Sequence, residues 1–284
     1  MASDSDVEIG DCAVTRHVLM CEPSHFRIAY EINPWMHRAN AVNGPVALEQ
    51  WRALHTQLGR LGVRVELVAQ AESLPDMTFA ANAGVVLGKR FIPANFRFPE
   101  RQPEAELFSD WFESAGYETV GIHLPHYWEG EGDVLDAGVS VVAGYRFRTE
   151  FRALDHLDEI LGRSTTRLEL ADARFYHLDT CFCPLTAGRA LYYPAAFSAD
   201  ARESLRALFD DLIAVPEGEA LRFACNAVIA GEGVVVLNTG CPETERELER
   251  RGVAFAATPT SEFIKAGGSV KCLVLTLDSF GVSS

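Results

Sequence analysis

A near-constant spacing of polar residues is the feature that most restricts how this chain can fold. Asn82, Asp133, His177, Asn226 and Cys272 each stand at the head of an apolar hairpin or strand, and successive members are separated by 51, 44, 49 and 46 residues. A period of this length is typical of repeated supersecondary units. We call these five polar residues the unit heads. Five units that each hold one such residue at the same structural point would converge on a central axis. The period therefore predicts a closed α/β arrangement with strands inside and helices outside.

The segments between these positions repeat one design, in which an amphipathic helix is followed by a short apolar strand and a hairpin. The predicted helices cover residues 45–62, 103–116, 149–162, 198–211 and 242–252. Most of them begin at proline, serine or threonine and end at glycine, as helix termini commonly do. No linker or low-complexity stretch interrupts the series. We therefore expect one domain over residues 1–284, with roughly the first ten residues as a flexible tail.

The charge and the cysteine content exclude several classes of protein. The net charge is −15, which disfavours nucleic acid and anionic membrane surfaces as partners and suits a cationic small substrate. No apolar stretch is long enough to cross a bilayer, and the acidic N-terminus lacks the order of a signal peptide. Seven cysteines spread over 284 residues do not indicate a disulfide scaffold. We predict a cytoplasmic protein with reduced thiols and leave open whether it forms homo-oligomers.

The segment DARFYHLDTCFCP (172–184) gathers imidazole, carboxylate and thiol groups within a few positions. In a strand, His177, Asp179, Cys181 and Cys183 would share one face. Such a face is compatible with a metal site, a part of a catalytic apparatus or an ordinary buried strand. No second thiol or imidazole pair stands at zinc-ligand spacing, and free cysteine commonly behaves as a small buried hydrophobe. We therefore interpret the two cysteines as core residues and predict no metal site.

A second segment, KAGGSVKCLVL (265–275), presents a thiol at the start of a predicted strand. The two glycines before it would let the backbone come close to a ligand. A thiol attacks as the thiolate and needs a basic or cationic partner. Among the five unit heads, His177 is the one histidine that could serve Cys272 in this way. The pair predicts nucleophilic catalysis.

Six stretches of the chain resemble one known group of proteins. They run in the order of that group and are MCEPSHFRIAYEINPWM (20–36), DMTFAANAG (76–84), FRFPERQPE (96–104), WEGEGD (128–133), FYHLDT (175–180) and GGSVKC (267–272). The resemblance is to the guanidine-modifying pentein superfamily, and most of all to its arginine dihydrolase branch. It implies a five-fold pseudo-symmetric α/β propeller. It also implies a hydrolase that cleaves C–N bonds of an arginine-type guanidino group through a covalent thiouronium, without a metal or an organic cofactor.

The resemblance also implies catalytic roles for individual residues. Cys272 matches the nucleophile, and His177 matches the general acid and base, which Glu129 orients. The acidic turn is one residue longer here than in the family, so Glu131 could take the place of Glu129. Asn226, which matches none of the quoted motifs, is interpreted as a hydrogen-bonded structural residue.

The same resemblance implies a set of substrate-binding residues. Asp179 matches the carboxylate that grips guanidinium nitrogens through charge-assisted hydrogen bonds. Arg101 matches the arginine that clamps the substrate carboxylate, although a solvated surface charge is the alternative, and Asn33 is expected near the amino-acid end of the substrate. Deiminases and dimethylargininases carry aspartate where this chain has Asn82, whereas dihydrolases carry asparagine. An amide can donate to a ureido oxygen, so we expect a citrulline-like intermediate to stay bound and to be attacked again.

Three functional hypotheses follow from these residues. The first is an arginine dihydrolase or deiminase, which gives ornithine or citrulline and ammonia. The second is an enzyme of the same fold that acts as a dimethylargininase or an amidinotransferase, because the walls of the pocket and not the catalytic groups set specificity. The third is a non-catalytic pentein that serves as a binding module. The presence of both Cys272 and His177 at unit heads disfavours the third.

Overall fold

The chain folds into five three-stranded sheets, and each sheet has the same pattern. The computed structural model describes residues 16–120, 126–186, 188–278 and 280. In every sheet, the central strand pairs antiparallel with one neighbour and parallel with the other. The sheet that contains both ends of the described chain has the order β15 (Leu275–Thr276), β1 (His17–Cys21), β2 (Arg64–Val68).

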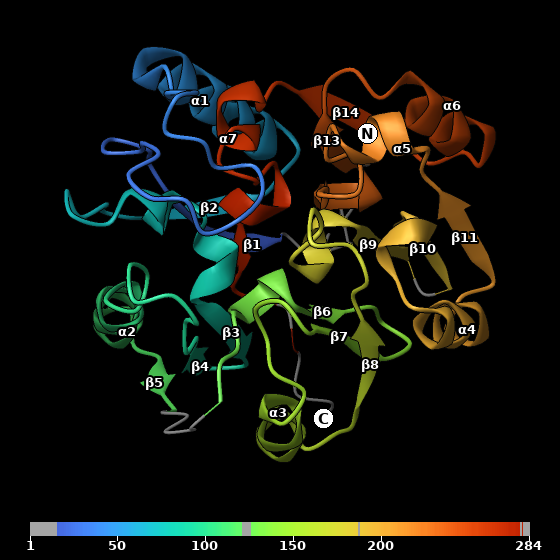
Figure 1. The fold of residues 1–284 in the computed structure, drawn as a ribbon, viewed down its shortest axis with the longest axis horizontal. Helices are drawn as coiled ribbons and strands as arrows, with labels where there is room; N and C mark the ends of the chain where they lie inside the picture. The colour runs from blue at the N-terminus through green and yellow to red at the C-terminus, as the bar shows by residue number, and fades with distance from the viewer. Residues whose placement is uncertain (1–15, 121–125, 187, 279, 281–284) are drawn as a thin grey trace, which may run out of the picture.

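The other four sheets follow one another along the chain. Their strand orders are β3 (Gly84–Leu87), β4 (Arg90–Pro93), β5 (Glu118–Thr119); β6 (Val134–Asp136), β7 (Val141–Tyr145), β8 (Thr165–Glu169); β9 (Phe182–Thr186), β10 (Arg189–Tyr192), β11 (Asp211–Ala214); and β12 (Val228–Ile229), β13 (Val235–Asn238), β14 (Phe255–Thr258). Figure 1 shows the sheets around a common centre, with β1, β3, β6, β9 and β13 nearer to it than the helices. The antiparallel pairing of β1 with β15 closes the ring. The predicted five-fold α/β propeller is confirmed.

The long helices lie on the outside of this ring (Figure 1). Those of eight residues or more are α1 (Gly44–Arg60), α2 (Glu104–Ser114), α3 (Ala153–Leu161), α4 (Ala199–Leu208) and α6 (Pro242–Arg250), and they are the five that the sequence predicts. Two short helices, α5 (Glu217–Ala220) and α7 (Ser261–Ile264), are additional. In α1 the buried stripe includes Trp51, Leu54 and Leu58, and burial of each such side chain contributes about 1.5–3 kcal/mol.

One helix begins later than the sequence predicts. We expected Thr149 to cap the third helix, but α3 starts at Ala153. The hydroxyl of Thr149 instead donates to the carboxylate of Asp133 at 2.7 Å, so it supports the second unit head. The helix ends as expected at Gly162, whose φ of +66° lies in the left-handed region that favours glycine.

Four of the five unit heads lie on or beside short 3₁₀ turns rather than on strands. The turns are η2 (Ala80–Ala83), η3 (Gly130–Gly132), η4 (Leu178–Thr180) and η7 (Lys271–Leu273), and they pack against one another around the axis. The expectation that His177, Asp179, Cys181 and Cys183 alternate along one strand is therefore wrong, since β9 begins only at Phe182. Cys272 likewise lies on a 3₁₀ turn before β15.

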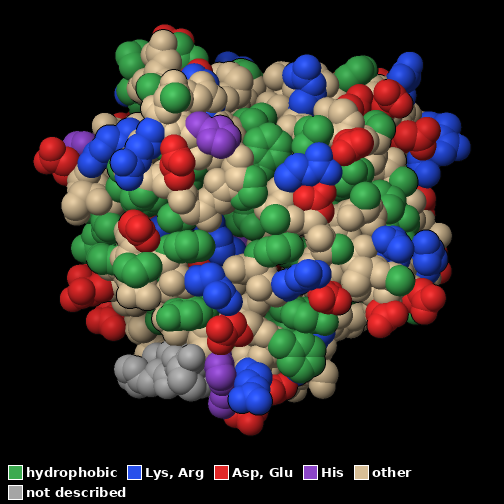
Figure 2. Space-filling view, in the orientation of Figure 1, with side chains coloured by type: hydrophobic (Ala, Val, Ile, Leu, Met, Phe, Trp, Pro, Cys, Tyr) green, Lys and Arg blue, Asp and Glu red, His purple; other side chains and the backbone are tan. Residues whose placement is uncertain are grey.

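The surface mixes both signs of charge. On the face shown in Figure 2, acidic and basic side chains are interspersed, and no large basic patch appears. Within the described part of the chain, no helix has both the length and the apolar character needed to cross a membrane.

Candidate active site

Cys272 lies in the wall of a small cavity where η2 and η7 meet the segment 22–43. The cavity holds about 10 Å³, roughly the space of one water molecule. Its lining residues are Ile32, Asn33, Met36, Asp76, Phe79, Asn82, Arg101, Arg148, Tyr176, Ala266, Gly268 and Cys272. The fold thus brings together four of the predicted site residues, which are separated by up to 239 positions (Asn33 to Cys272) in the sequence.

The sulfur of Cys272 has two polar neighbours. The amide nitrogen Nδ2 of Asn226 lies 3.1 Å from Sγ, and the thiol donates to Oδ2 of Asp179 at 3.3 Å. Burial, reinforced by the charge of Asp179, raises the pKa of the Cys272 thiol well above its usual value. Burial also raises the pKa of Asp179 to about 7, against the lowering effect of Lys271. Cys272 is therefore a neutral thiol in this structure.

His177 does not line this cavity, and a buried carboxylate holds its ring. Its Nε2 lies 2.8 Å from Oε2 of Glu129, and the same oxygen accepts from Arg148 at 2.9 Å. Burial alone would raise the pKa of Glu129, but Arg148 and His177 hold it well below its usual value. Glu129 is therefore an anion that can fix the ring of His177 and compensate a positive charge on it.

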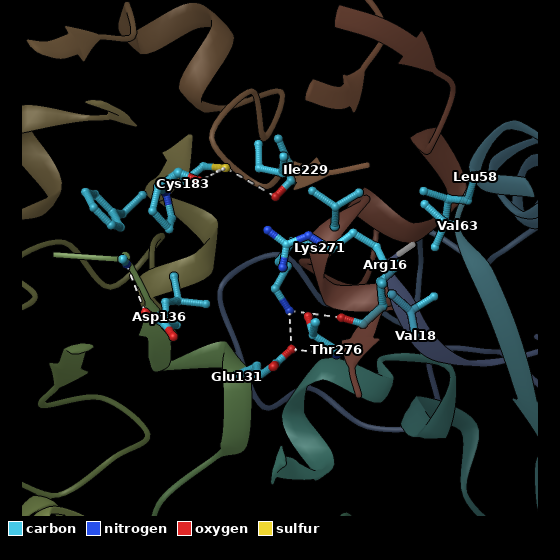
Figure 3. Close-up of a pocket in the computed structure, with 17 residues that line it drawn as sticks. Arg16, Val18, Leu58, Val63, Glu131, Asp136, Cys183, Ile229, Lys271 and Thr276 are labelled. Atoms are coloured by element: carbon cyan, nitrogen blue, oxygen red, sulfur yellow. Dashed lines mark hydrogen bonds and ion pairs between the residues drawn. The ribbon is translucent and has the colours of Figure 1, made fainter. Parts of the chain in front are cut away.

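The choice between Glu129 and Glu131 is decided by the geometry of the turn. Glu131 points to the other side of η3 and pairs with Lys271, whose Nζ lies 2.8 Å from its Oε2. Figure 3 shows this pair in the wall of a second cavity, of about 260 Å³, which shares no lining residue with the first. Neighbouring residues of η7 thus face different cavities, with Lys271 in one and Cys272 in the other.

Two glycines of the acidic turn allow this close packing. A Cβ on Gly132 would lie 2.4 Å from Nδ2 of Asn82 and 3.2 Å from the ring of His177. Gly130 has a φ of +56°, and a Cβ there would lie 2.6 Å from the backbone nitrogen of Gly84. The sequence Glu-Gly-Glu-Gly therefore places one carboxylate beside the histidine and leaves room for the amide and the imidazole to approach.

If the predicted hydrolase activity is present, Gly132→Ala is expected to lower kcat/KM for a guanidino substrate by about 100-fold, because a displacement of about 1 Å in a catalytic group has an effect of this size. The control is Gly59→Ala in α1, where a Cβ meets nothing within 4 Å and alanine favours the helix. Steady-state kinetics of both variants, with thermal unfolding, check the prediction. Wild-type kinetics in Gly132→Ala would show that the close packing is dispensable.

Three polar atoms at or beside the cavity are buried and have no hydrogen-bond partner among the described residues. They are Oδ1 of Asp76 and Nδ2 of Asn82, two residues that line the cavity, and Oδ1 of Asp179, a residue that does not line it but contacts Cys272. Buried polar atoms of this kind are normally satisfied, so together they form a template of two acceptors and one donor. Asp76 was not among the predicted site residues. The signal was present in DMTFAANAG, where an acidic residue precedes an otherwise apolar run.

The side chain of Asn82 can be oriented without ambiguity. Its Oδ1 accepts from a terminal nitrogen of Arg101 at 2.8 Å, and a guanidinium has no acceptor for an amide N–H. Nδ2 must therefore point away from Arg101. Nδ2 instead faces Gly132, near the ring of His177, and it has no acceptor among the described residues.

Arg101 and Asn33 both line the cavity, and their side chains are already hydrogen-bonded to other groups of the protein. Arg101 is 3% exposed and forms a two-point pair with Glu104, at 3.0 and 2.8 Å, so the alternative of a solvated charge is wrong. Asn33 donates to the carbonyl of Ala266 and accepts from the backbone N–H groups of Trp35 and Met36. The bond to Ala266 ties the segment 22–43 to the C-terminal part of the chain, and the other two shape the turn at Asn33.

The structure also places an arginine that sequence reasoning missed. Arg148 is buried between the rings of Phe98 and Tyr176, with centroid distances of 4.7 and 4.6 Å. It donates to Glu129 and, at 3.1 Å, to the carbonyl of Ile32. One side chain thus connects the carboxylate behind His177 with the segment that covers the cavity.

The two cysteines near His177 are bonded to backbone carbonyls and not to each other. Cys181 donates to the carbonyl of Leu178 at 3.5 Å, and Cys183 donates to that of Ala227 at 3.4 Å. Both are buried. Among the described residues, no group of three or more His, Cys, Asp or Glu side chains has an arrangement that could hold a metal ion.

Comparison with known proteins relates the whole arrangement to enzymes. Residues 25–278 match the model of the family described as N,N dimethylarginine dimethylhydrolase, eukaryotic. The N(G),N(G)-dimethylarginine dimethylaminohydrolase of Mycobacterium tuberculosis is 42% identical over 263 residues, which are 93% of this chain and 86% of the relative. The bifunctional arginine dihydrolase/ornithine cyclodeaminase ArgZ of Synechocystis sp. is 40% identical over 266 residues. That match covers 91% of this chain but only 37% of the bifunctional relative.

Solved structures share the fold. The N-terminal domain of ArgZ bound to substrate has a TM-score of 0.89 and 37% identity, over 94% of this chain and 99% of that one. The same domain, in a variant covalently bound to a reaction intermediate, also has a TM-score of 0.89. A dimethylarginine dimethylaminohydrolase adduct has a TM-score of 0.77 at 22% identity, which supports the fold alone. These matches favour the hydrolase over a non-catalytic binding module. The chain belongs to the N,N-dimethylarginine dimethylhydrolase family and is a hydrolase of C–N bonds in guanidino groups.

Proposed function

We propose that this chain hydrolyses arginine in two successive rounds at one site. Two water molecules are consumed, and the products are ornithine, two molecules of ammonia and carbon dioxide. The similarity to ArgZ over 91% of the chain supports this reaction. The ornithine cyclodeaminase activity in the name of that relative is not part of the proposal, because the match leaves most of the relative uncovered.

In the first round Cys272 is the nucleophile. The positive guanidinium binds between the carboxylates of Asp76 and Asp179, and its charge beside the sulfur favours the thiolate. The thiolate adds to the guanidino carbon, and His177, oriented by Glu129, protonates the departing nitrogen. The C–N bond breaks, ammonia leaves, and a covalent thiouronium remains. Water activated by His177 then adds to the same carbon and releases the C–S bond, which gives citrulline.

The substrate's amino-acid end is assigned to the outer part of the cavity. Arg101 and Arg148 both line it and carry the positive charge that a carboxylate requires, and Asn33 lies on the same wall. Since the cavity holds about 10 Å³, arginine enters only when a wall moves. We expect the stretch 32–36 to move, which lines the cavity and is bonded to the rest of the protein through Ile32, Asn33 and Trp35. The flanking parts of the segment 22–43 are anchored separately, for example by His25 and Asn43.

The observation that carries the second round is the orientation of Asn82. A guanidinium has donors only, whereas a ureido group has one acceptor oxygen and two nitrogens that donate. The two free carboxylate oxygens and the free amide N–H match the ureido group better than the guanidinium. Because Arg101 fixes the amide, the N–H cannot be exchanged for the oxygen without loss of that bond. Citrulline is therefore retained in position for a second attack by Cys272.

We predict that Asn82→Asp stops the reaction at citrulline. The aspartate offers no donor to the ureido oxygen, and loss of a hydrogen bond to a site built for it costs about 1–3 kcal/mol, or about 10–100-fold in the second round. The measurement is the ratio of ammonia to ornithine and citrulline over time. Wild type is expected to give two ammonia molecules per ornithine. One ammonia with accumulated citrulline in wild type would reject the two-round scheme.

A second candidate function is the hydrolysis of N-methylated arginine. It is favoured by the relative from Mycobacterium tuberculosis, which is 42% identical and named for dimethylarginine. The two substrates are compared by kcat/KM on arginine and on dimethylarginine, with citrulline and methylamine measured as products. A kcat/KM that is higher for dimethylarginine would replace the first proposal with the second.

We extend the proposal to the domain organisation, the cellular location and the oligomeric state of the enzyme. One catalytic unit over residues 1–284 is supported by the pairing of β1 with β15, which joins both ends of the described chain. A cytoplasmic location is supported by the cysteines of the described residues, all six of which are free and buried. Self-association stays a prediction, which sedimentation can check.

A further inference from the structure

Asn226 was interpreted from the sequence as a structural residue, but all of its polar atoms engage the site. It is fully buried and lies just before β12. Its Oδ1 accepts from the backbone N–H groups of Ser269 and Cys272 at 3.1 and 3.2 Å. Its Nδ2 lies 3.0 Å from the carbonyl of Asp179 and 3.1 Å from the sulfur of Cys272.

These four contacts fix the amide in one orientation. Oδ1 faces two N–H donors, so it cannot be exchanged with the nitrogen. Nδ2 carries two hydrogens, and one is available for the carbonyl of Asp179 and one for the sulfur. Asn226, the fourth unit head, is therefore hydrogen-bonded to the turns that carry the third and the fifth heads. Its partner Asp179 lies two residues after His177, and its partner Ser269 lies three residues before Cys272.

We propose that Asn226 is a positioning residue for the nucleophile: its acceptor half holds the turn that carries Cys272, and its donor half stabilises the thiolate of Cys272. This inference rests on the proposed role of Cys272 as the nucleophile. An N–H donor aimed at an atom that becomes negative stabilises that charge most when the site is dry and the donor needs no reorganisation. At Cys272, burial and the carboxylate of Asp179 both raise the pKa of the thiol, and the hydrogen bond from Asn226 acts against them.

Another asparagine of the same repeat shows what a purely structural amide looks like. Asn238 is also buried, its Oδ1 accepts from the N–H and the hydroxyl of Thr260, and its Nδ2 donates to the carbonyl of Arg222. Like Asn226, it accepts two bonds and donates one to a backbone carbonyl, but it has no second donated bond to a sulfur. Asn238 therefore provides a matched control for Asn226.

The test separates the two halves of the amide. Asn226→Asp keeps an oxygen for the N–H groups of Ser269 and Cys272 but replaces the donor beside the sulfur with an acceptor. The readout is the rate of alkylation of Cys272 by iodoacetamide as a function of pH, with the labelled cysteine identified by mass spectrometry. We expect at least a tenfold slower rate near neutral pH and a profile displaced to higher pH. Asn238→Asp, which makes the same change away from the thiol, should leave the profile of Cys272 unchanged.

Kinetics with arginine give a second readout. Loss of one donor to a developing charge lowers kcat by about 100–1,000-fold, and KM should stay within a few fold because Asn226 does not line the substrate cavity. Equal effects of Asn226→Asp and Asn238→Asp on alkylation, or a wild-type profile in Asn226→Asp, would overturn the inference. If Asn226→Asp does not fold, Asn226→Ser is used, and its alkylation rate must likewise fall below that of wild type.

Alkylation needs no substrate, so the role of Asn226 can be tested independently of the proposed hydrolysis of arginine. An enzyme that does not hydrolyse arginine but shows the displaced alkylation profile in Asn226→Asp would reject the proposed substrate and keep the role of Asn226. Two-round hydrolysis of arginine by wild type, together with an unchanged alkylation profile in Asn226→Asp, would keep the proposed substrate and reject the role of Asn226.

Discussion

Replacement of Cys272 by serine should reduce hydrolysis of arginine by at least about 10,000-fold, as expected when the nucleophile of a covalent mechanism is removed. A hydroxyl in this place is nearly the size of the thiol, so the packing of η7 is kept. It ionises far less readily than a thiol, however, and it lies beside the carboxylate of Asp179, which disfavours a second negative charge. The covalent thiouronium therefore cannot form.

The measurement combines kinetics with intact mass. Wild type trapped during turnover should carry the mass of the covalent intermediate, and Cys272→Ser should not. The control is Cys183→Ser, because Cys183 is buried, lines the second cavity and bonds only to the backbone carbonyls of Pro184 and Ala227, which serine can also do. Residual activity of Cys272→Ser above about one hundredth of wild type would contradict the assignment of the nucleophile.

The architecture could be predicted because the polar residues and the helical segments recur at a nearly constant interval along the sequence. Helix, strand and hairpin recur in each unit, and their apolar periodicities are local signals that one sequence displays. The closure of the ring also follows from repetition, since five equivalent units must share one axis. The order of strands in each sheet, with one antiparallel and one parallel pairing, did not follow from the period.

The local geometry at the unit heads could not be predicted in the same way. Alternating residues in HLDTCFC suggested a strand, but the hydroxyl of Thr180 donates to the carbonyl of His177 at 2.6 Å and the backbone N–H of Thr180 points to the same atom, at 3.2 Å. Such local bonds from threonine compete with strand pairing. The resulting turn places His177 toward Glu129 and Asp179 toward Cys272, which a strand with both side chains on one face would not explain.

Unlike Asp76, the site residues Arg148 and Asn226 lack any local signal in the sequence. Arg146, Arg148 and Arg152 stand close together in YRFRTEFRAL, and only the packing of Phe98 and Tyr176 selects Arg148 for the site. Asn226 is likewise recognisable only once the turn of Cys272 is folded against it. The sequence predicts which units converge, whereas contacts between the units decide which side chains do the chemistry.

The largest effect apart from the nucleophile is expected for Glu129→Gln. The glutamine is nearly the same shape, but it cannot compensate the positive charge that His177 acquires when it takes a proton. It also leaves Arg148 buried without its anion, since Arg148 and Glu129 are 2.9 Å apart and both inaccessible. Removal of the equivalent charge behind a catalytic histidine lowers kcat by about 10,000-fold, and we expect a loss of about 1,000–10,000-fold here.

Glu131→Gln makes the same substitution two residues along the same turn and serves as the control for Glu129→Gln. Glu131 pairs with Lys271 at 2.8 Å and faces the second cavity, so its loss should lower the free energy of unfolding while kcat/KM for arginine stays within about tenfold of wild type. Thermal unfolding and steady-state kinetics of the two variants are compared side by side. Because the two carboxylates belong to one 3₁₀ turn, a change in the turn itself would affect both variants alike. Equal losses of activity would therefore show that the turn, and not the charge behind His177, is what catalysis requires.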